Sequence, residues 1–171
     1  MRIFLIGYMG SGKSSTGKRL ARALGLPFVD TDIEIKHAQQ KSISDIFKEQ
    51  GEMAFREMER DCLLELQTKN SIGVFATGGG MPCFHDNMKL MNQLGITIYL
   101  KRPAKELAQR LENSKKSRPL IADKTEGELL HFVEKQLIDR EKYYALASIT
   151  ANRNEQTLNS LIDLLHLNLM E

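Results

Sequence analysis

The stretch that most limits how this chain can fold is GYMGSGKSS, residues 7–15, which directly follows the apolar run Arg2–Ile6. From Gly7 to Ser14 it fits the pattern G-x-x-x-x-G-K-[ST], in which a strand leads through a glycine-rich loop into a helix. Glycines let the backbone curl so that successive N–H groups converge on phosphate oxygens at the positive end of the helix. The motif therefore predicts a nucleoside triphosphate site.

The motif also assigns roles to its residues. Lys13 is expected to bridge the β- and γ-phosphates, and the Ser14 hydroxyl to coordinate Mg²⁺. A chance match on an ordinary strand-to-helix turn is the alternative, but both the position and the context of the motif argue against it. The loop residues expected to bind ATP are Gly10, Ser11, Gly12, Lys13, Ser14 and Ser15.

Short apolar runs alternate with helical patterns along the rest of the chain. The runs expected to form strands are 2–6, 27–30, 72–76, 96–100 and 148–151. Between them, apolar side chains recur at spacings of three and four, which is typical of helices packed on one face. The alternation predicts an α/β, three-layer fold of the P-loop NTPase type, with a five-stranded parallel sheet and helices on both faces. At 171 residues the chain suits a single domain, 1–171.

Charge and hydrophobicity narrow the possible partners. The net charge of +2 does not favour a nucleic acid, but residues 101–118 carry seven basic side chains against two acidic ones, which suits a small anionic ligand. Cys62 and Cys83 form no CxxC motif, which fits a reducing compartment. No apolar run approaches the ~20 residues of a membrane span, and the first residues do not resemble a signal peptide. We expect a cytoplasmic monomer with no membrane partner.

Two carboxylates, Asp30 and Asp32, occur where the second expected strand ends. Residues two apart in an extended segment point to the same side, so both would face one cleft at the carboxyl edge of the sheet. One would orient Mg²⁺ through its waters, and the other would accept a proton from a hydroxyl that attacks the γ-phosphate. The alternative is that Asp32 only caps a helix beginning at Ile33.

A helical stretch, GEMAFREMER, places Arg56 and Glu59 beside each other at i and i+3 on the flank of an apolar stripe. An exposed ion pair there would contribute only roughly a few tenths of a kcal/mol, and this is the alternative to a functional role. Arg140, in DREKYY, has the same ambiguity. Together, Arg56 and Arg140 would form a planar clamp for a carboxylate.

Two further segments need explanation. Three consecutive glycines follow the third expected strand in TGGGMP, although a tight turn would account for only one or two of them. The polar segment 113–124 lacks clean periodicity and predicts a mobile lid. The three glycines are Gly78, Gly79 and Gly80.

With these motifs in view, the chain resembles the shikimate kinases, from Ile3 to about Arg153. The combination of DTD, GExxFRxxE, TGGG and RPL at Arg118–Leu120 is close to specific for that family. The resemblance implies transfer of the ATP γ-phosphate to the 3-hydroxyl of shikimate, in the pathway to chorismate and the aromatic amino acids. A gluconate-type kinase of the same fold is the alternative, because gluconate is also a hydroxy acid.

The resemblance implies an acceptor site within residues 31–62 and beyond. Asp32 would bind the ring hydroxyls and be the candidate base, while Arg56 and Arg140 would hold the shikimate carboxylate. The glycine turn 78–80 would let the ring approach the main chain closely, because a side chain there would occupy the substrate's space.

On the nucleotide side, the resemblance implies that Asp30 joins Ser14 in serving Mg²⁺. Arg118, on the lid, would reach the transferring phosphate. Arg110 and Arg153 would border the adenine.

Overall fold

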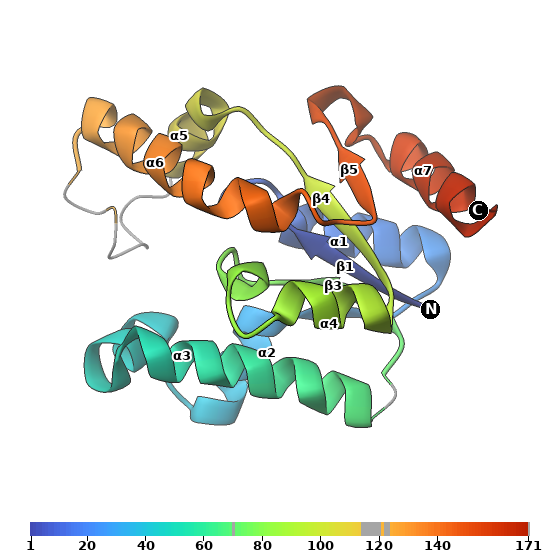
Figure 1. Cartoon of the computed structure of the whole chain (residues 1–171), viewed down its shortest axis with the longest axis horizontal. Helices are drawn as coiled ribbons and strands as arrows, with labels where there is room; N and C mark the ends of the chain where they lie inside the picture. The colour runs from blue at the N-terminus through green and yellow to red at the C-terminus, as the bar shows by residue number, and fades with distance from the viewer. Residues whose placement is uncertain (70, 114–120, 122–123, 171) are drawn as a thin grey trace.

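The computed structural model describes residues 1–69, 71–113, 121 and 124–170. Within these ranges, helices alternate with short strands (Figure 1). The strands are β1 (Arg2–Ile6), β2 (Phe28–Asp30), β3 (Gly73–Ala76), β4 (Ile96–Leu100) and β5 (Ile149–Ala151). The helices are α1 (Lys13–Leu24), α2 (Thr31–Gln39), α3 (Ile43–Thr68), α4 (Asn87–Leu94), α5 (Ala104–Glu112), α6 (Glu126–Tyr144) and α7 (Leu158–Met170), with short 3-10 turns η1 (Met81–Cys83) and η4 (Arg153–Glu155).

The strands form one parallel sheet in the order β2-β3-β1-β4-β5. Each of the five strands begins and ends within one residue of its predicted bounds. The predicted α/β class and the five-stranded parallel sheet are therefore confirmed.

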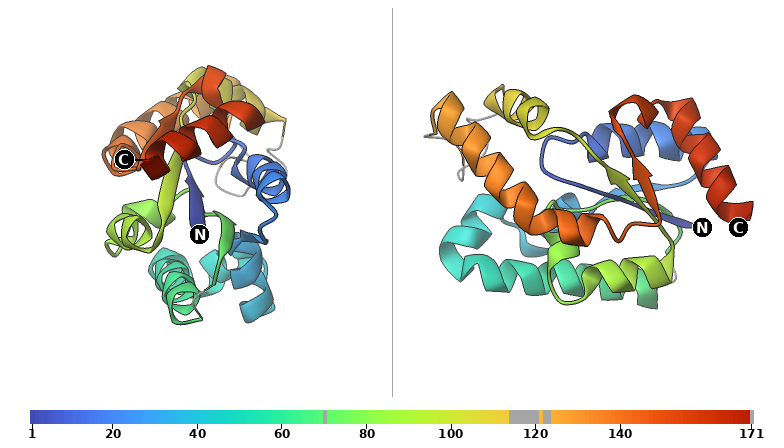
Figure 2. Two further views of the ribbon diagram at one scale, coloured as in Figure 1. Left: turned by 90° about the vertical axis from the view of Figure 1, so that its right-hand side faces the viewer. Right: turned by 45° about the horizontal axis from the view of Figure 1, so that its top comes forward.

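The alternation of side chains along β1 explains why helices cover both faces of the sheet. Ile3 and Leu5 point to one face, where they pack with residues of α1 and α7. Phe4 and Ile6 point to the other face, where they pack with residues of α4, α5 and α6. All four side chains are fully buried, as expected for the central strand of a parallel sheet. Figure 2 shows the helices lying on both sides of the sheet.

The helices that carry the candidate site have identifiable boundaries. Ser42 caps α3, because its hydroxyl accepts a hydrogen bond from the Asp45 N–H at 3.1 Å. The same helix is broken at Gly51, where φ is +82° and ψ is 174°. None of the described helices combines the length and the apolar character needed to span a membrane.

Because the sheet is parallel, the carboxyl ends of all its strands lie along one edge. The phosphate-loop motif follows β1, Asp30 ends β2, and the glycine turn follows β3. The segments after β4 and β5 lead into α5 and η4 at the same edge. In open α/β folds ligands bind outside this edge, so the fold brings the predicted motifs to one place.

Candidate active site

The loop between β1 and α1 has the conformation that the glycine motif requires. Gly7 and Gly12 have φ values of +137° and +100°, in the left-handed region that other residues rarely adopt. The Thr16 N–H donates to the Gly12 carbonyl at 2.9 Å, so α1 begins directly at the end of the loop. The positive end of α1 therefore points into the loop, as anion binding requires.

Lys13, the first residue of α1, folds back over this loop. Its Nζ donates to the Gly7 carbonyl at 2.8 Å and to the Tyr8 carbonyl at 3.0 Å. Only 9% of Lys13 is exposed, so its apolar stem packs against the protein while its ammonium lies inside the loop. The charge is thus placed where the motif predicts phosphates.

The two aspartates lie next to the loop and have different local roles. Asp30 accepts a hydrogen bond from the Ser14 hydroxyl at 2.6 Å, and its other carboxylate oxygen accepts from the Asp32 N–H at 3.2 Å. The second contact caps α2, which begins at Thr31 and not at Ile33. The alternative that Asp32 is only a helix cap is therefore wrong, because Asp30 is the cap. Asp32 lies on the first turn of α2, not on an extended strand.

A cleft of about 400 Å³ joins the loop to the neighbouring strand ends. Both aspartates line it, as predicted, although a helix turn rather than strand geometry brings Asp32 there. Ser11, whose side chain is buried, is not among the lining residues. The lining residues are Met9, Gly10, Gly12, Lys13, Ser14, Ser15, Asp30, Asp32, Thr77, Gly79 and Arg110.

Arg56 and Glu59 form a buried ion pair, so the exposed-pair alternative is wrong. Arg56 is 6% exposed and Glu59 is fully buried. Arg56 Nη1 donates to Glu59 Oε2 at 2.7 Å, while Nη2 donates to Glu52 Oε1 at 2.7 Å. The guanidinium also lies 4.5 Å from the centre of the Phe84 ring. These contacts on several sides fix the orientation of the Arg56 side chain.

The glycine turn after β3 is explained by close packing of the site against its backbone. None of Gly78, Gly79 and Gly80 lies in the left-handed region, so conformational freedom is not the reason for the glycines. A Cβ on Gly78 would overlap the carboxylates of Glu59 and Asp32, and a Cβ on Gly80 would overlap the Arg56 guanidinium. At Gly79 it would lie 3.2 Å from the N of Met9 in the phosphate loop.

Arg140, on α6, also lies near this region. Its guanidinium lies 5.4 Å from the centre of the Tyr8 ring, and its charge acts on the Glu59 carboxyl. Tyr144, one helical turn further along α6, donates from its hydroxyl to the Gly79 carbonyl at 2.5 Å. Tyr144 was not among the site residues predicted from the sequence, although its spacing of four from Arg140 places both on one helix face.

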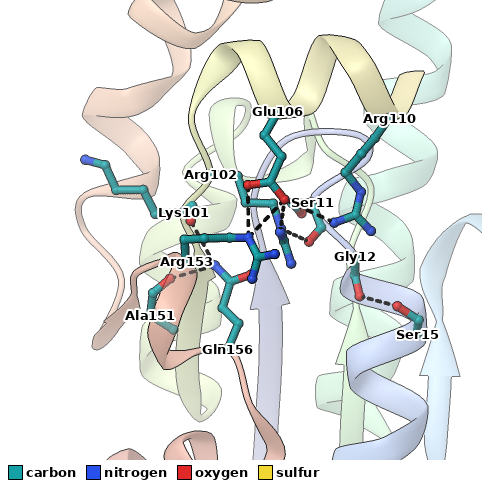
Figure 3. A network of polar contacts seen from close by, with 10 residues as sticks. All are labelled: Ser11, Gly12, Ser15, Lys101, Arg102, Glu106, Arg110, Ala151, Arg153 and Gln156. Carbon is teal, nitrogen blue, oxygen red and sulfur yellow. Dashed lines mark hydrogen bonds and ion pairs between the residues drawn. The ribbon is translucent and has the colours of Figure 1, made fainter. Parts of the chain in front are cut away.

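The two arginines expected at the adenine are linked by Glu106, which was not among the site residues predicted from the sequence. Arg110 Nη1 lies 3.7 Å from Glu106 Oε1, and Arg153 Nε lies 3.0 Å from Glu106 Oε2 (Figure 3). Arg102, Glu106 and Arg110 are spaced four apart, a spacing typical of ion pairs along a helix. That spacing would have identified Glu106 from the sequence.

The predicted lid, residues 113–124, lies mostly outside the described residues. Arg118, with its predicted contact to the transferring phosphate, belongs to the part that is not described, as do Lys115 and Lys116. Ile121 is described and fully buried in the core beside α5 and α6. The closing motion of the lid and the role of Arg118 remain predictions.

The buried Glu59 carboxyl predicts a pH-dependent contribution to stability. Burial raises the pKa of Glu59 from 4.5 to about 7, against the opposing effect of the Arg56 guanidinium. Between these values the folded protein retains a proton that the unfolded chain has lost, so the stability from this group is lost as the pH rises through about 7. Relative to a Glu59→Gln variant, the wild-type free energy of unfolding should fall from pH 5 to pH 8 by at most about 3 kcal/mol.

Urea unfolding at both pH values measures this difference. The matched control is Glu65→Gln, which removes an exposed carboxylate from the same helix and should give little pH-dependent difference. The assignment is wrong if the difference between wild type and Glu59→Gln is the same at pH 5 and pH 8.

The fold and the cleft together define the class of enzyme to which this protein belongs. A parallel sheet of this order, a phosphate loop after its central strand and a carboxylate pair beside that loop are the features of an ATP-dependent P-loop kinase acting on a small molecule. Residues 9–166 match the sequence model of the shikimate kinase family. The chain belongs to the shikimate kinase family.

Individual relatives agree with this assignment. A shikimate kinase of Azobacteroides pseudotrichonymphae is 48% identical over 162 residues, which cover 95% of each chain. The crystal structure of shikimate kinase from Bacteroides thetaiotaomicron matches with a TM-score of 0.88 and 38% identity, covering 100% of this chain and 99% of the other. Shikimate kinase from Acinetobacter baumannii, solved in complex with shikimate, matches with a TM-score of 0.84 and 34% identity, covering 99% and 93%.

The alternative acceptor class has a structural neighbour too. A gluconokinase from Sinorhizobium meliloti matches with a TM-score of 0.56 but only 18% identity, covering 98% of this chain and 93% of the other. A match at that identity shows a shared fold and nothing about the acceptor.

Proposed function

We propose that this protein transfers the γ-phosphoryl group of ATP to the 3-hydroxyl of shikimate, giving shikimate 3-phosphate for the pathway to chorismate and the aromatic amino acids. One observation carries the proposal. Beside the phosphate-loop cleft, the glycine turn packs directly against the side chains of Asp32 and Arg56. A carboxylate, a guanidinium and bare backbone thus converge next to the triphosphate site, and these groups suit a ring that carries both hydroxyls and a carboxylate.

On the nucleotide side, the loop backbone would bind the phosphates. Lys13 would stabilise the negative charge that develops on the transferred phosphoryl group. Phosphoryl transfer depends on positioning and electrostatic stabilisation, so a buried ammonium at this position has a large effect on the rate. Arg110 lines the same cleft, which supports a place for it beside the nucleotide. Arg153 would border the adenine, and Arg118 would reach the transferring phosphate when the lid closes.

The donor set next to Lys13 fits Mg²⁺. Ser14 and Asp30 present a hydroxyl and a carboxylate within 2.6 Å of each other, and magnesium prefers oxygen ligands of this kind while keeping several waters. When bound, the ion would neutralise charge on the β- and γ-phosphates. Asp30 would act at a distance through water, because one of its oxygens also caps α2.

On the acceptor side, Asp32 would orient the attacking hydroxyl and accept its proton as the bond to phosphorus forms. Arg56 and Arg140 would hold the substrate carboxylate, and both charges act on the buried Glu59. Glu59 and Glu52 hold the Arg56 guanidinium in place. Little conformational entropy would therefore be lost when this guanidinium binds a carboxylate. The acceptor hydroxyl would then lie between Asp32 and the γ-phosphate.

An acceptor comparison tests the proposal against the gluconate-type alternative. With MgATP in excess, ADP release should be rapid with shikimate and at least about 100-fold slower with gluconate, because gluconate lacks the rigid ring whose hydroxyls and carboxylate Asp32, Arg56 and Arg140 would hold. A coupled assay of ADP measures both rates on the same preparation. Equal rates with the two acids would contradict the proposed acceptor, and ADP release that does not depend on either acid would contradict a kinase acting on them.

A further inference from the structure

One carboxylate at the carboxyl ends of β4 and β5 is surrounded by three guanidinium groups. Glu106 Oε1 accepts from Arg102 Nη1, both Glu106 oxygens accept from Arg153 Nε at 3.0 and 3.1 Å, and Arg110 Nη1 lies 3.7 Å away (Figure 3). We refer to Arg102, Glu106, Arg110 and Arg153 as the Glu106 cluster. Because three positive charges meet one negative charge, the cluster retains a positive charge next to the phosphate loop.

Arg102 connects this cluster to the phosphate loop. Its Nε donates to the Ser11 carbonyl at 2.8 Å, and only 9% of its side chain is exposed. The peptide bonds of the described residues are all trans, and in a trans peptide the C=O and the following N–H point in opposite directions. By holding the Ser11 carbonyl, Arg102 therefore fixes the direction in which the Gly12 N–H points.

The direction of this N–H bears on ligand binding. Gly12 lines the cleft and is the last loop residue before Lys13, where the motif places the phosphates. A loop N–H stabilises an anion only when it is aimed at the anion before binding, since reorientation would otherwise be required. Arg102 thus acts on the Ser11–Gly12 peptide without itself lining the cleft.

The backbone that carries Arg153 is also held in place. Gln156 Nε2 donates to the Lys101 carbonyl at 2.8 Å and to the Ala151 carbonyl at 2.9 Å, which ties η4 to the ends of β4 and β5 (Figure 3). The Asn152 N–H donates to Glu155 at 2.8 Å across the same turn. Glu106 therefore connects two fixed elements, α5 and η4, by way of their arginines.

We propose that Arg102 and Glu106 are positioning residues for the nucleotide. Arg102 aims the Ser11–Gly12 peptide at the triphosphate, and Glu106 holds Arg102 together with Arg110 and Arg153 on the base side. This inference rests on the proposed function, because it takes the cleft to be the ATP site. One carboxylate then couples the phosphate half of the site to the base half.

The exposed fractions of the side chains indicate which ion pair of the Glu106 cluster contributes most to stability. The Arg102–Glu106 pair is largely shielded from water, so loss of either partner leaves a poorly solvated charge. The side chains of Arg110 and Arg153 are 42% and 62% exposed, and ion pairs as exposed as these contribute little to stability. For these two arginines, the loss of Glu106 would therefore appear in ligand binding more than in folding.

The test compares two ligands that share phosphates but not a base. Dissociation constants for MgADP, magnesium tripolyphosphate and shikimate would be measured by calorimetry on wild type, Arg102→Met and Glu106→Gln. Arg102→Met should weaken both phosphate ligands about tenfold, the effect of one lost charge-assisted hydrogen bond, and leave shikimate binding unchanged. Glu106→Gln should weaken MgADP more than tripolyphosphate, because it also releases the base-side arginines.

Further variants make the result decisive. The double variant should bind tripolyphosphate no more weakly than Arg102→Met alone, because Glu106 acts on the phosphates through Arg102. Arg102→Lys, which keeps the charge and a donor nitrogen, should restore part of the tripolyphosphate affinity and serves as the test if Arg102→Met does not fold. Exposed residues provide matched controls in Arg22→Met and Glu134→Gln, which should bind all three ligands like the wild type.

Unchanged phosphate affinity in Arg102→Met and Glu106→Gln, with only a lower Tm, would overturn the inference, as would an equal loss of shikimate binding. A Lys13→Met variant separates this failure from that of the proposed function. If Lys13→Met binds MgADP normally, the cleft is not the nucleotide site and the proposed function fails. If Lys13→Met loses MgADP while the cluster variants keep it, only the positioning role fails.

Discussion

Lys13→Met should lower the rate of ADP formation about 10³-fold or more while leaving the protein folded. The Lys13 ammonium lies inside the phosphate loop, on the Gly7 and Tyr8 carbonyls, where it would face the β- and γ-phosphates. Removal of one preorganised charge from a water-excluded site costs roughly 10²–10³-fold, and here the lost group also binds the ground state. Methionine is the appropriate replacement because the Lys13 stem is buried and methionine preserves most of its packing.

Steady-state kinetics with shikimate and MgATP measure this effect, and thermal unfolding checks that the fold is intact. Lys89→Met, an exposed lysine on α4, is the matched control and should keep the wild-type rate. A Lys13→Met variant with near-normal turnover would refute the role of the loop in phosphoryl transfer.

Asp32→Asn should lower kcat by roughly 10²-fold or more if Asp32 accepts the proton of the attacking hydroxyl. The amide is nearly isosteric with the carboxylate but does not accept a proton at neutral pH. Because Asp30 and not Asp32 caps α2, the substitution leaves the helix start intact. The expected loss is therefore in the chemical step and not in stability.

The kinetic parameter that changes separates two roles for Asp32. A loss confined to KM for shikimate would mean that the carboxylate only positions the ring, and would contradict a role as base. Asp163→Asn, on the exposed face of α7, is the matched control and should leave both parameters unchanged. If KM for ATP changed as much as KM for shikimate, the proposed role of Asp32 with the acceptor would be contradicted.

Much of the fold was predictable because its signals are local. Alternating strand and helix patterns gave the strands to within one residue. The phosphate loop was predictable because left-handed conformations at Gly7 and Gly12 require glycine at fixed spacing. Parallel order then brings the strand ends to one edge without any further information.

The environment of each charge was not predictable, since it depends on contacts between distant segments. The spacing of Arg56 and Glu59 is the same for an exposed pair and for the buried pair that forms beneath the glycine turn. For the same reason, no sequence pattern predicts the contact between Glu106 and Arg153, which are 47 residues apart in the sequence. The glycine turn was correctly marked as unusual, but its cause, the packing of three side chains against its backbone, required the structure.

The position of the phosphate on the product tests the central claim most directly. After complete conversion of shikimate with MgATP, proton-coupled phosphorus NMR of the purified product should show one ester whose phosphorus couples to the ring hydrogen at C3. That result follows if Asp32 and the Arg56–Arg140 pair place the 3-hydroxyl, and no other, next to the γ-phosphate. An ester on a different hydroxyl, or inorganic phosphate as the only new phosphorus species beside ADP, would contradict the account.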